Sequence, residues 1–84
     1  MNNKVLVEIS VPAAGGKYDV FIPLDSRMSE VVRLVASAMS ELSQGRYKAT
    51  EQAVLLDAES GTILRSDMMV EELGIKNGSR LVLV

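Results

Sequence analysis

The chain has 84 residues and a net charge of −2, and 48% of its residues are hydrophobic, so we expect a single globular domain that spans residues 1–84. It has no cysteine, no histidine, no run of basic residues and few aromatic residues, and no apolar stretch approaches the ~20 residues of a membrane span. These features exclude disulfides, thiolate chemistry and the commonest metal ligand, argue against nucleic-acid binding, and favour a cytoplasmic protein.

A strand is expected over residues 4–11, because apolar and polar residues alternate there. Pro12 ends this strand, and the glycine-rich segment 13–17 follows. A second alternating strand, residues 18–24, comes directly after this segment. The segment is therefore interpreted as a hairpin turn and not as a phosphate-binding loop, which opens a helix. The side chains expected to face the core are Val5, Val7, Ile9 and Val11 from the first strand and Tyr18, Val20, Ile22 and Leu24 from the second.

An amphipathic helix is expected next. Asp25 and Ser26 are suitable N-cap residues, and Gly45 can end the helix in the left-handed conformation. At ~100° per residue the apolar side chains fall within an arc of about 120°. They are Met28, Val31, Val32, Val35, Ala38, Met39 and Leu42. Such a stripe predicts a helix that lies on a sheet, with its methionines in the core.

The second half of the chain contains short elements. A third strand is expected over residues 53–56 with Val54 and Leu56 inward and Leu55 outward, because the opposite register would bury Asp57. Residues 57–61 are interpreted as a solvated turn and not as a calcium loop, which needs more oxygen ligands. A short fourth strand (62–65), a helical turn within 66–74, a turn at 77–78 and a last strand (79–84) complete the pattern.

This order of elements predicts an α+β fold. The first two strands form a hairpin, the last strand pairs parallel with the first, and the helix crosses one face of a mixed sheet with the strand order 2-1-5-3-4. That arrangement is the ubiquitin-like β-grasp.

Two segments resemble the YukD/EsaB family of ubiquitin-like proteins of type VII secretion systems in Gram-positive bacteria. They are residues 18–23 (YDVFIP), followed by the long apolar helix, and residues 73–84 (LGIKNGSRLVLV). Many members carry an aspartate where this chain has Ser79. The resemblance implies a cytosolic accessory subunit whose partners include an FtsK/SpoIIIE-type ATPase and a pseudokinase-like membrane subunit, and which is not conjugated to other proteins.

The sequence favours one class of function over its alternatives. A non-covalent binding module is favoured over a protein modifier or a sulfur carrier of the thiamin and molybdopterin kind, because those proteins use a flexible C-terminal glycine and this sequence ends in Val84. A ubiquitin-like docking domain of another bacterial complex is a further alternative. An enzyme is not expected, because neither histidine nor cysteine is present to form a familiar nucleophile–base pair, and no cofactor or metal is expected.

The candidate binding residues follow from the expected strand order. In the β-grasp the outward positions of four adjacent strands bring apolar residues onto the face opposite the helix. A patch of this kind often marks a protein-interaction site, here for a secretion subunit or a second copy of the chain. The alternative is that these residues serve only strand formation. The proposed protein-binding residues are Leu6, Phe21, Leu55, Val82 and Val84.

Overall fold

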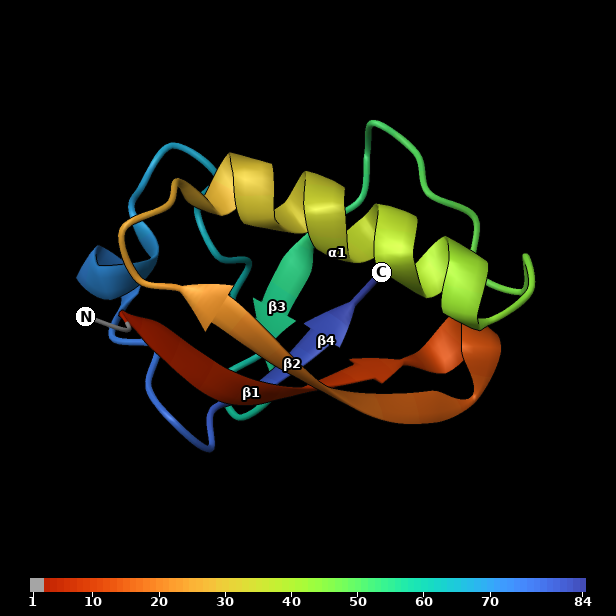
Figure 1. The fold of residues 1–84 in the computed structure, drawn as a ribbon, viewed down its shortest axis with the longest axis horizontal. Coiled ribbons are helices and arrows are strands. Elements are labelled where there is room, and N and C mark those ends of the chain that lie inside the picture. Colours follow the sequence, from red (N-terminus) through yellow and green to blue (C-terminus); the bar gives the residue numbers. More distant parts are fainter. Residues whose placement is uncertain (1–2) are drawn as a thin grey trace.

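The computed structural model describes residues 3–84 and confirms an α+β, ubiquitin-like β-grasp fold. One helix lies across one face of a four-stranded mixed sheet with the order β2-β1-β4-β3 (Figure 1). The elements are β1 (Lys4–Val11), a 3-10 turn η1 (Pro12–Ala14), β2 (Gly16–Pro23), α1 (Met28–Leu42), β3 (Leu55–Asp57), a second 3-10 turn η2 (Val70–Leu73) and β4 (Arg80–Leu83).

The expected fourth strand is reduced to a single bridge between Ile63 and Leu56 of β3. Two hydrogen bonds flank this bridge: Leu64 N–H donates to the Leu55 carbonyl at 2.9 Å, and Asp57 N–H donates to the Thr62 carbonyl, also at 2.9 Å. A tight turn lies directly before the bridge, so the segment pairs with β3 over too short a stretch to count as a strand. The other four strands have the expected order.

The core lies between α1 and the inner face of the sheet. Strands β1 and β2 pair antiparallel and form the expected hairpin, and β4 runs parallel to β1, with Leu81 beside Ile9. Burying alternate aliphatic side chains of these strands under one helix removes apolar area from water and stabilises the fold. The most deeply buried side chains are Val7, Ile9, Val11, Ile22, Met28, Met39, Leu55, Val70, Leu81 and Leu83.

The buried stripe of α1 is rotated slightly from the expected one. Ala36 is buried, whereas Ala38 is exposed and Leu42 is 63% exposed. The methionines Met28 and Met39 lie in the core, as predicted.

The start of α1 is not capped by Asp25 or Ser26. Arg27 occupies the N-cap position and makes no side-chain cap hydrogen bond. Instead, Met28 N–H donates to the Met68 carbonyl at 2.8 Å, and Ser29 N–H to the Ser66 carbonyl at 2.9 Å. The first amides of the helix are thus satisfied by a backbone segment about forty residues later in the chain.

The other end of α1 closes one residue before the expected Gly45. Gln44, which follows the C-cap Ser43, has a left-handed φ of 55°, and its N–H donates to the Glu41 carbonyl at 3.1 Å. Gly45 has a positive φ of 84° and its N–H donates to the Ser40 carbonyl at 2.9 Å. These two hydrogen bonds close the helix, and Gln44 takes the left-handed position that glycine commonly occupies.

Candidate functional site

The sheet face opposite α1, called the outer face below, carries the first candidate residues. Leu6 of β1 and Phe21 of β2 lie directly opposite each other in the antiparallel ladder. Leu6 is 37% and Phe21 61% exposed, so the pair forms an accessible apolar spot, as the alternation of both strands predicted.

A second apolar group lies on the outer face where β3 meets β4. Val82 is opposite Leu56, and Leu56 is bridged to Ile63, so these three side chains share the face. Val84 N–H donates to the Val54 carbonyl at 3.0 Å and Val54 N–H to the Val84 carbonyl at 3.2 Å, which continues the same ladder. Ile63 is 56% and Val84 51% exposed. We call this group the aliphatic cluster: Val54, Leu56, Ile63, Val82 and Val84.

The expected outward position of Leu55 is wrong. Leu55 is fully buried in the core, and Leu56 takes the outer face instead. The sequence argument rejected this register because it would bury Asp57. In the structure β3 ends at Asp57, and the Asp57 carboxylate accepts hydrogen bonds from Ser60 in the following turn. The carboxylate therefore stays solvated, and the inward register of Leu55 carries no penalty.

Val54 and Leu56 were missed as members of the surface for the same reason, and Ile63 was missed because its bridge to Leu56 was not expected. Once Leu55 is placed inward, alternation alone puts Val54 and Leu56 outward. Ile63 could have been found as an apolar residue just after the 57–61 turn, where a return segment must lie beside β3.

The expected continuous apolar row across four strands does not form. The parallel register of β1 and β4 places Arg80 beside Glu8 and Val82 beside Ser10. Leu6 therefore lies beyond the start of β4, where its N–H donates to the Asn77 side-chain oxygen at 2.7 Å. The outer face thus has two apolar groups, the Leu6–Phe21 pair and the aliphatic cluster, separated by charged residues.

Of the charged residues between the two groups, some form ion pairs and others do not. Glu8 lies directly opposite Asp19 in the β1–β2 ladder, which brings two carboxylates together. Arg80, on the other side of Glu8, makes its ion pair with Glu59 instead, with 3.6 Å between Nη2 and Oε1. Within residues 3–84 no ion pair involves Glu8 or Asp19.

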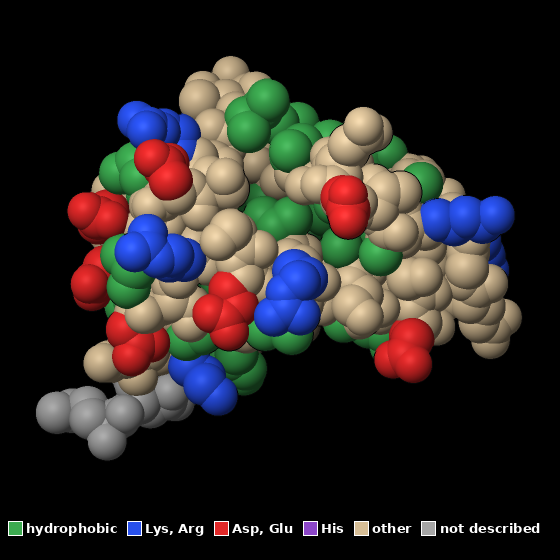
Figure 2. Space-filling view, turned by 90° about the horizontal axis from the view of Figure 1, so that it is seen from above, with side chains coloured by type: hydrophobic (Ala, Val, Ile, Leu, Met, Phe, Trp, Pro, Cys, Tyr) green, Lys and Arg blue, Asp and Glu red, His purple; other side chains and the backbone are tan. Residues whose placement is uncertain are grey.

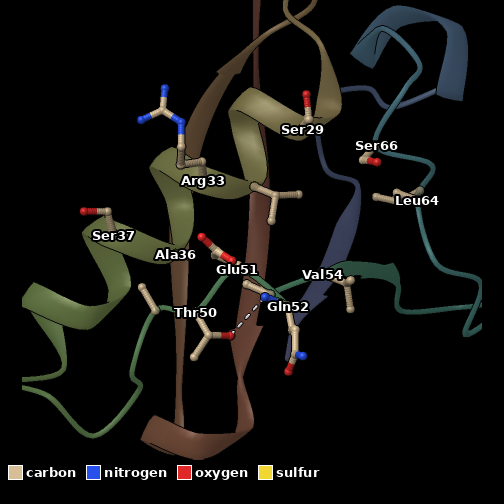
Figure 3. A pocket seen from close by; sticks show the side chains of 13 residues that line it. Ser29, Arg33, Ala36, Ser37, Thr50, Glu51, Gln52, Val54, Leu64 and Ser66 are labelled. Atoms are coloured by element: carbon tan, nitrogen blue, oxygen red, sulfur yellow. Dashed lines mark hydrogen bonds between the residues drawn. The ribbon is translucent and has the colours of Figure 1, made fainter.

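A groove of about 720 Å³ lies between α1 and residues 49–54, and Val54 of the aliphatic cluster is among the residues that line it (Figure 3). Its walls are mostly small or polar side chains, among them Ser29, Ala36, Ser37 and Thr50.

Figure 2, which views the molecule from above, shows apolar side chains between polar ones and charges of both signs scattered over this face. This face shows no concentrated basic area of the kind that binds nucleic acid.

The titratable groups with a perturbed pKa have structural roles. Hydrogen bonds from Ser60 lower the pKa of Asp57, and a hydrogen bond from Arg65 lowers the pKa of Asp67. Burial raises the pKa of Tyr47, which packs under the end of α1.

Across residues 3–84 there is no group of three or more acidic, histidine or cysteine side chains that could hold a metal ion. In the same range, no helix is both long and apolar enough to cross a membrane.

Comparison with known proteins then decides the family. The model of a family described as WXG100 protein secretion system, protein YukD, matches residues 6–83, nearly the whole chain. The chain belongs to the YukD family. The resemblance of residues 18–23 and 73–84 to this family is thereby confirmed. A comparison with curated protein sequences finds no significant match.

Solved structures similar to this YukD-family chain include domains of mycobacterial secretion proteins. The ubiquitin-like domain of the Mycobacterium tuberculosis type VII secretion protein EccD1 has a TM-score of 0.76 and 19% identity, covering 96% of this chain and 97% of that one. The EccD5 ubiquitin-like domain from Mycobacterium xenopi has a TM-score of 0.71 and 20% identity, covering 96% and 92%. A chain of the MycP5-free ESX-5 inner membrane complex has a TM-score of 0.72 and 22% identity, covering 98% of this chain but 21% of its own length. At these identities the likeness concerns the fold.

Proposed function

We propose that this single domain is a non-catalytic protein-interaction module and serves as an accessory or regulatory subunit of a type VII (WXG100) secretion system. Membership of the YukD family supports the association with secretion. We propose further that the module binds without being conjugated. Membership of the YukD family supports this, because the resemblance implies subunits that are not conjugated to other proteins.

The aliphatic cluster is the observation that carries the binding role. Five aliphatic side chains from β3, β4 and the segment after β3 gather on one rigid surface, and two of them are more than half exposed. Exposed apolar groups of this kind mark interaction sites more often than isolated ones do. Burial of each such side chain against a partner contributes roughly 1.5–3 kcal/mol before the costs of association.

The proposed partners are membrane-bound secretion subunits, namely the FtsK/SpoIIIE-type ATPase and the pseudokinase-like subunit that the family resemblance implies. The similar chain in the ESX-5 inner membrane complex supports the choice of membrane-bound partners, since that chain belongs to an inner membrane complex. We propose that the protein is cytoplasmic and is recruited to the inner face of the membrane by these partners.

Co-purification from native membranes tests the proposal. Tagged wild-type protein is expected to recover the ATPase or the pseudokinase-like subunit, and the double variant Ile63→Ser/Val84→Ser is expected to lose them while melting cooperatively. The matched control is Leu34→Ser/Leu42→Ser, which removes from α1 two leucines that are also more than half exposed. Recovery of only an adenylating enzyme would contradict this function. Equal recovery of the secretion subunits by wild type and the cluster variant would contradict this site.

A further inference from the structure

Strand β2 forms one edge of the sheet and pairs only with β1. Leu24 N–H donates to the Asn3 carbonyl at 2.7 Å, which fixes which residues of β2 direct their backbone groups toward β1. Along an edge strand, residues that bond to the neighbouring strand alternate with residues whose backbone groups point away from it. The even-numbered residues of β2 therefore bond to β1. The N–H and C=O groups of Lys17, Asp19 and Phe21 therefore point away from the sheet.

This row of outward amides is open. Among residues 3–84, the N–H groups of Lys17, Asp19 and Phe21 donate no hydrogen bond to an acceptor outside the hairpin. The opposite edge differs, because Leu64 N–H donates to the Leu55 carbonyl and so covers β3. Strand β2 is regular over eight residues, and its proline, Pro23, stands at its end. An unprotected edge of this kind is a ready template for another strand.

The charges beside this edge indicate what it fits. Asp19 is the middle residue of the row, its side chain lies on the outer face, and Glu8 is directly opposite it. Two carboxylates in this position repel each other unless a cation joins them. A hollow of about 530 Å³ at this point is lined by Leu6, Glu8, Asp19, Phe21, Asn77 and Arg80, among others. An acidic pair therefore borders the apolar Leu6–Phe21 pair.

A second copy of the chain is a poor occupant of this edge. Antiparallel self-pairing that uses all three outward residues is centred on Asp19 and places Asp19 opposite its own copy. With Glu8 behind each Asp19, four carboxylates would lie in one line across the joined sheets. Such like-charge contacts disfavour self-association along β2.

We propose that β2 accepts an extended segment of a protein partner as a fifth strand, and that this segment carries a lysine or arginine opposite Asp19 and an apolar side chain opposite Phe21. The basic residue neutralises Asp19 and Glu8 together, and the outward backbone groups of Lys17, Asp19 and Phe21 form the ladder. This inference rests on the proposed function for the existence of a partner, and it adds a docking mode separate from the aliphatic cluster.

Backbone amide hydrogen exchange followed by NMR tests the docking mode with defined probes. A synthetic seven-residue peptide with a central lysine, a valine two residues to each side of it and threonine elsewhere is expected to slow exchange at residues 17, 19 and 21, whereas the same peptide with glutamate in place of lysine has no effect. Asp19→Lys should reverse this preference, with at least about tenfold weaker binding of the lysine peptide. Glu51→Lys, which reverses an exposed charge in the 49–54 segment, is the matched control. Equal effects of both peptides, no effect of either, or protection confined to the aliphatic cluster would overturn the proposal.

Blocking the edge tests the same mode in the native setting. Lys17→Pro removes one outward N–H at a position where an edge strand tolerates proline, and Lys17→Ala removes only the side chain. Co-purification of secretion subunits should fall at least severalfold with Lys17→Pro and stay at the wild-type level with Lys17→Ala. If wild type and both variants recover the subunits equally, the proposed function stands and docking on β2 is wrong. If wild type recovers none of them, the proposed function itself fails.

Discussion

Asp57 and Ser60 are joined by two hydrogen bonds to one carboxylate oxygen. Oδ2 of Asp57 accepts from the Ser60 hydroxyl at 2.8 Å and from the Ser60 backbone N–H at 3.2 Å. Gly61 N–H also donates to the Asp57 carbonyl at 2.8 Å, and Gly61 has a positive φ of 72°. These contacts close the turn after β3 and keep the charge of Asp57 in water while Leu55, two residues earlier, is buried.

The Asp57–Ser60 contact predicts a dependence of stability on acid. The pKa of Asp57 is lowered in the folded state from its ordinary value of 3.8, first by the Ser60 hydroxyl and then by the Ser60 N–H. A lowered carboxyl pKa contributes stability that is fully present above the unfolded-state pKa and is lost as pH falls through the folded-state pKa. The melting temperature should therefore fall on acidification below about pH 4, and Asp67, held by Arg65, acts in the same direction.

Thermal melts of wild type and Ser60→Ala across this acidic range measure the effect. Ser60→Ala should lower the melting temperature at neutral pH and make its acid dependence shallower, because the folded and unfolded pKa values of Asp57 then lie closer together. Ser37→Ala, at an exposed helix position, serves as the control. Identical acid dependence in Ser60→Ala and wild type would show that the turn does not perturb Asp57.

Leu55 and its neighbour Leu56 give a direct test of the β3 register. Leu55→Ala should destabilise the protein by about 2–5 kcal/mol, because the side chain is fully buried and its removal leaves a cavity. Leu56→Ala, on the outer face, should cost about 1 kcal/mol or less. Chemical denaturation of both variants decides between the registers, and the reverse order of stabilities would restore the sequence-based assignment.

Long periodic segments allowed most of the fold to be predicted from sequence. The alternation over residues 4–11 and 18–24 and the helical stripe after Met28 each extend over enough residues for their period to be unambiguous. The strand order followed from the sequence of elements. The short β3 offered no such period, and there the presumed cost of burying Asp57 decided the register wrongly.

The candidate site was harder to predict, because it depends on register between distant strands. The faces of Leu6, Phe21, Val82 and Val84 followed from alternation within each strand. Their separation into two groups depends on the offset of β4 against β1, with Arg80 beside Glu8, which no local pattern specifies. The same holds for the start of α1, whose amides are satisfied by the carbonyls of Ser66 and Met68 and not by a neighbouring side chain.

Ser43 provides a prediction at the end of α1. Ser43 is buried. Its hydroxyl oxygen accepts a hydrogen bond from Tyr47 N–H at 3.0 Å, and its hydroxyl donates to the Ser40 carbonyl at 3.4 Å. Ser43→Ala leaves the buried Tyr47 N–H without this partner and should cost about 1–3 kcal/mol. Urea denaturation measures it, with the exposed Ser37→Ala as control. A loss no larger than that of the control would mean that water replaces the hydroxyl.

Val35 and Ala38 test which face of α1 meets the sheet. Both fall in the apolar arc of the sequence, but Val35 is buried at 5% exposure and Ala38 is exposed. Val35→Asp places a carboxylate in the core without a partner, which costs several kcal/mol, comparable to the total stability of a small domain, so this variant should be unfolded. Ala38→Asp keeps its charge in water and should lose only about 0.5–1 kcal/mol of stability, mainly through lower helix propensity.

Circular dichroism melts of the two variants compare their stabilities. A cooperative melt of Val35→Asp near the wild-type midpoint, or unfolding of Ala38→Asp, would show that another face of the helix packs on the sheet.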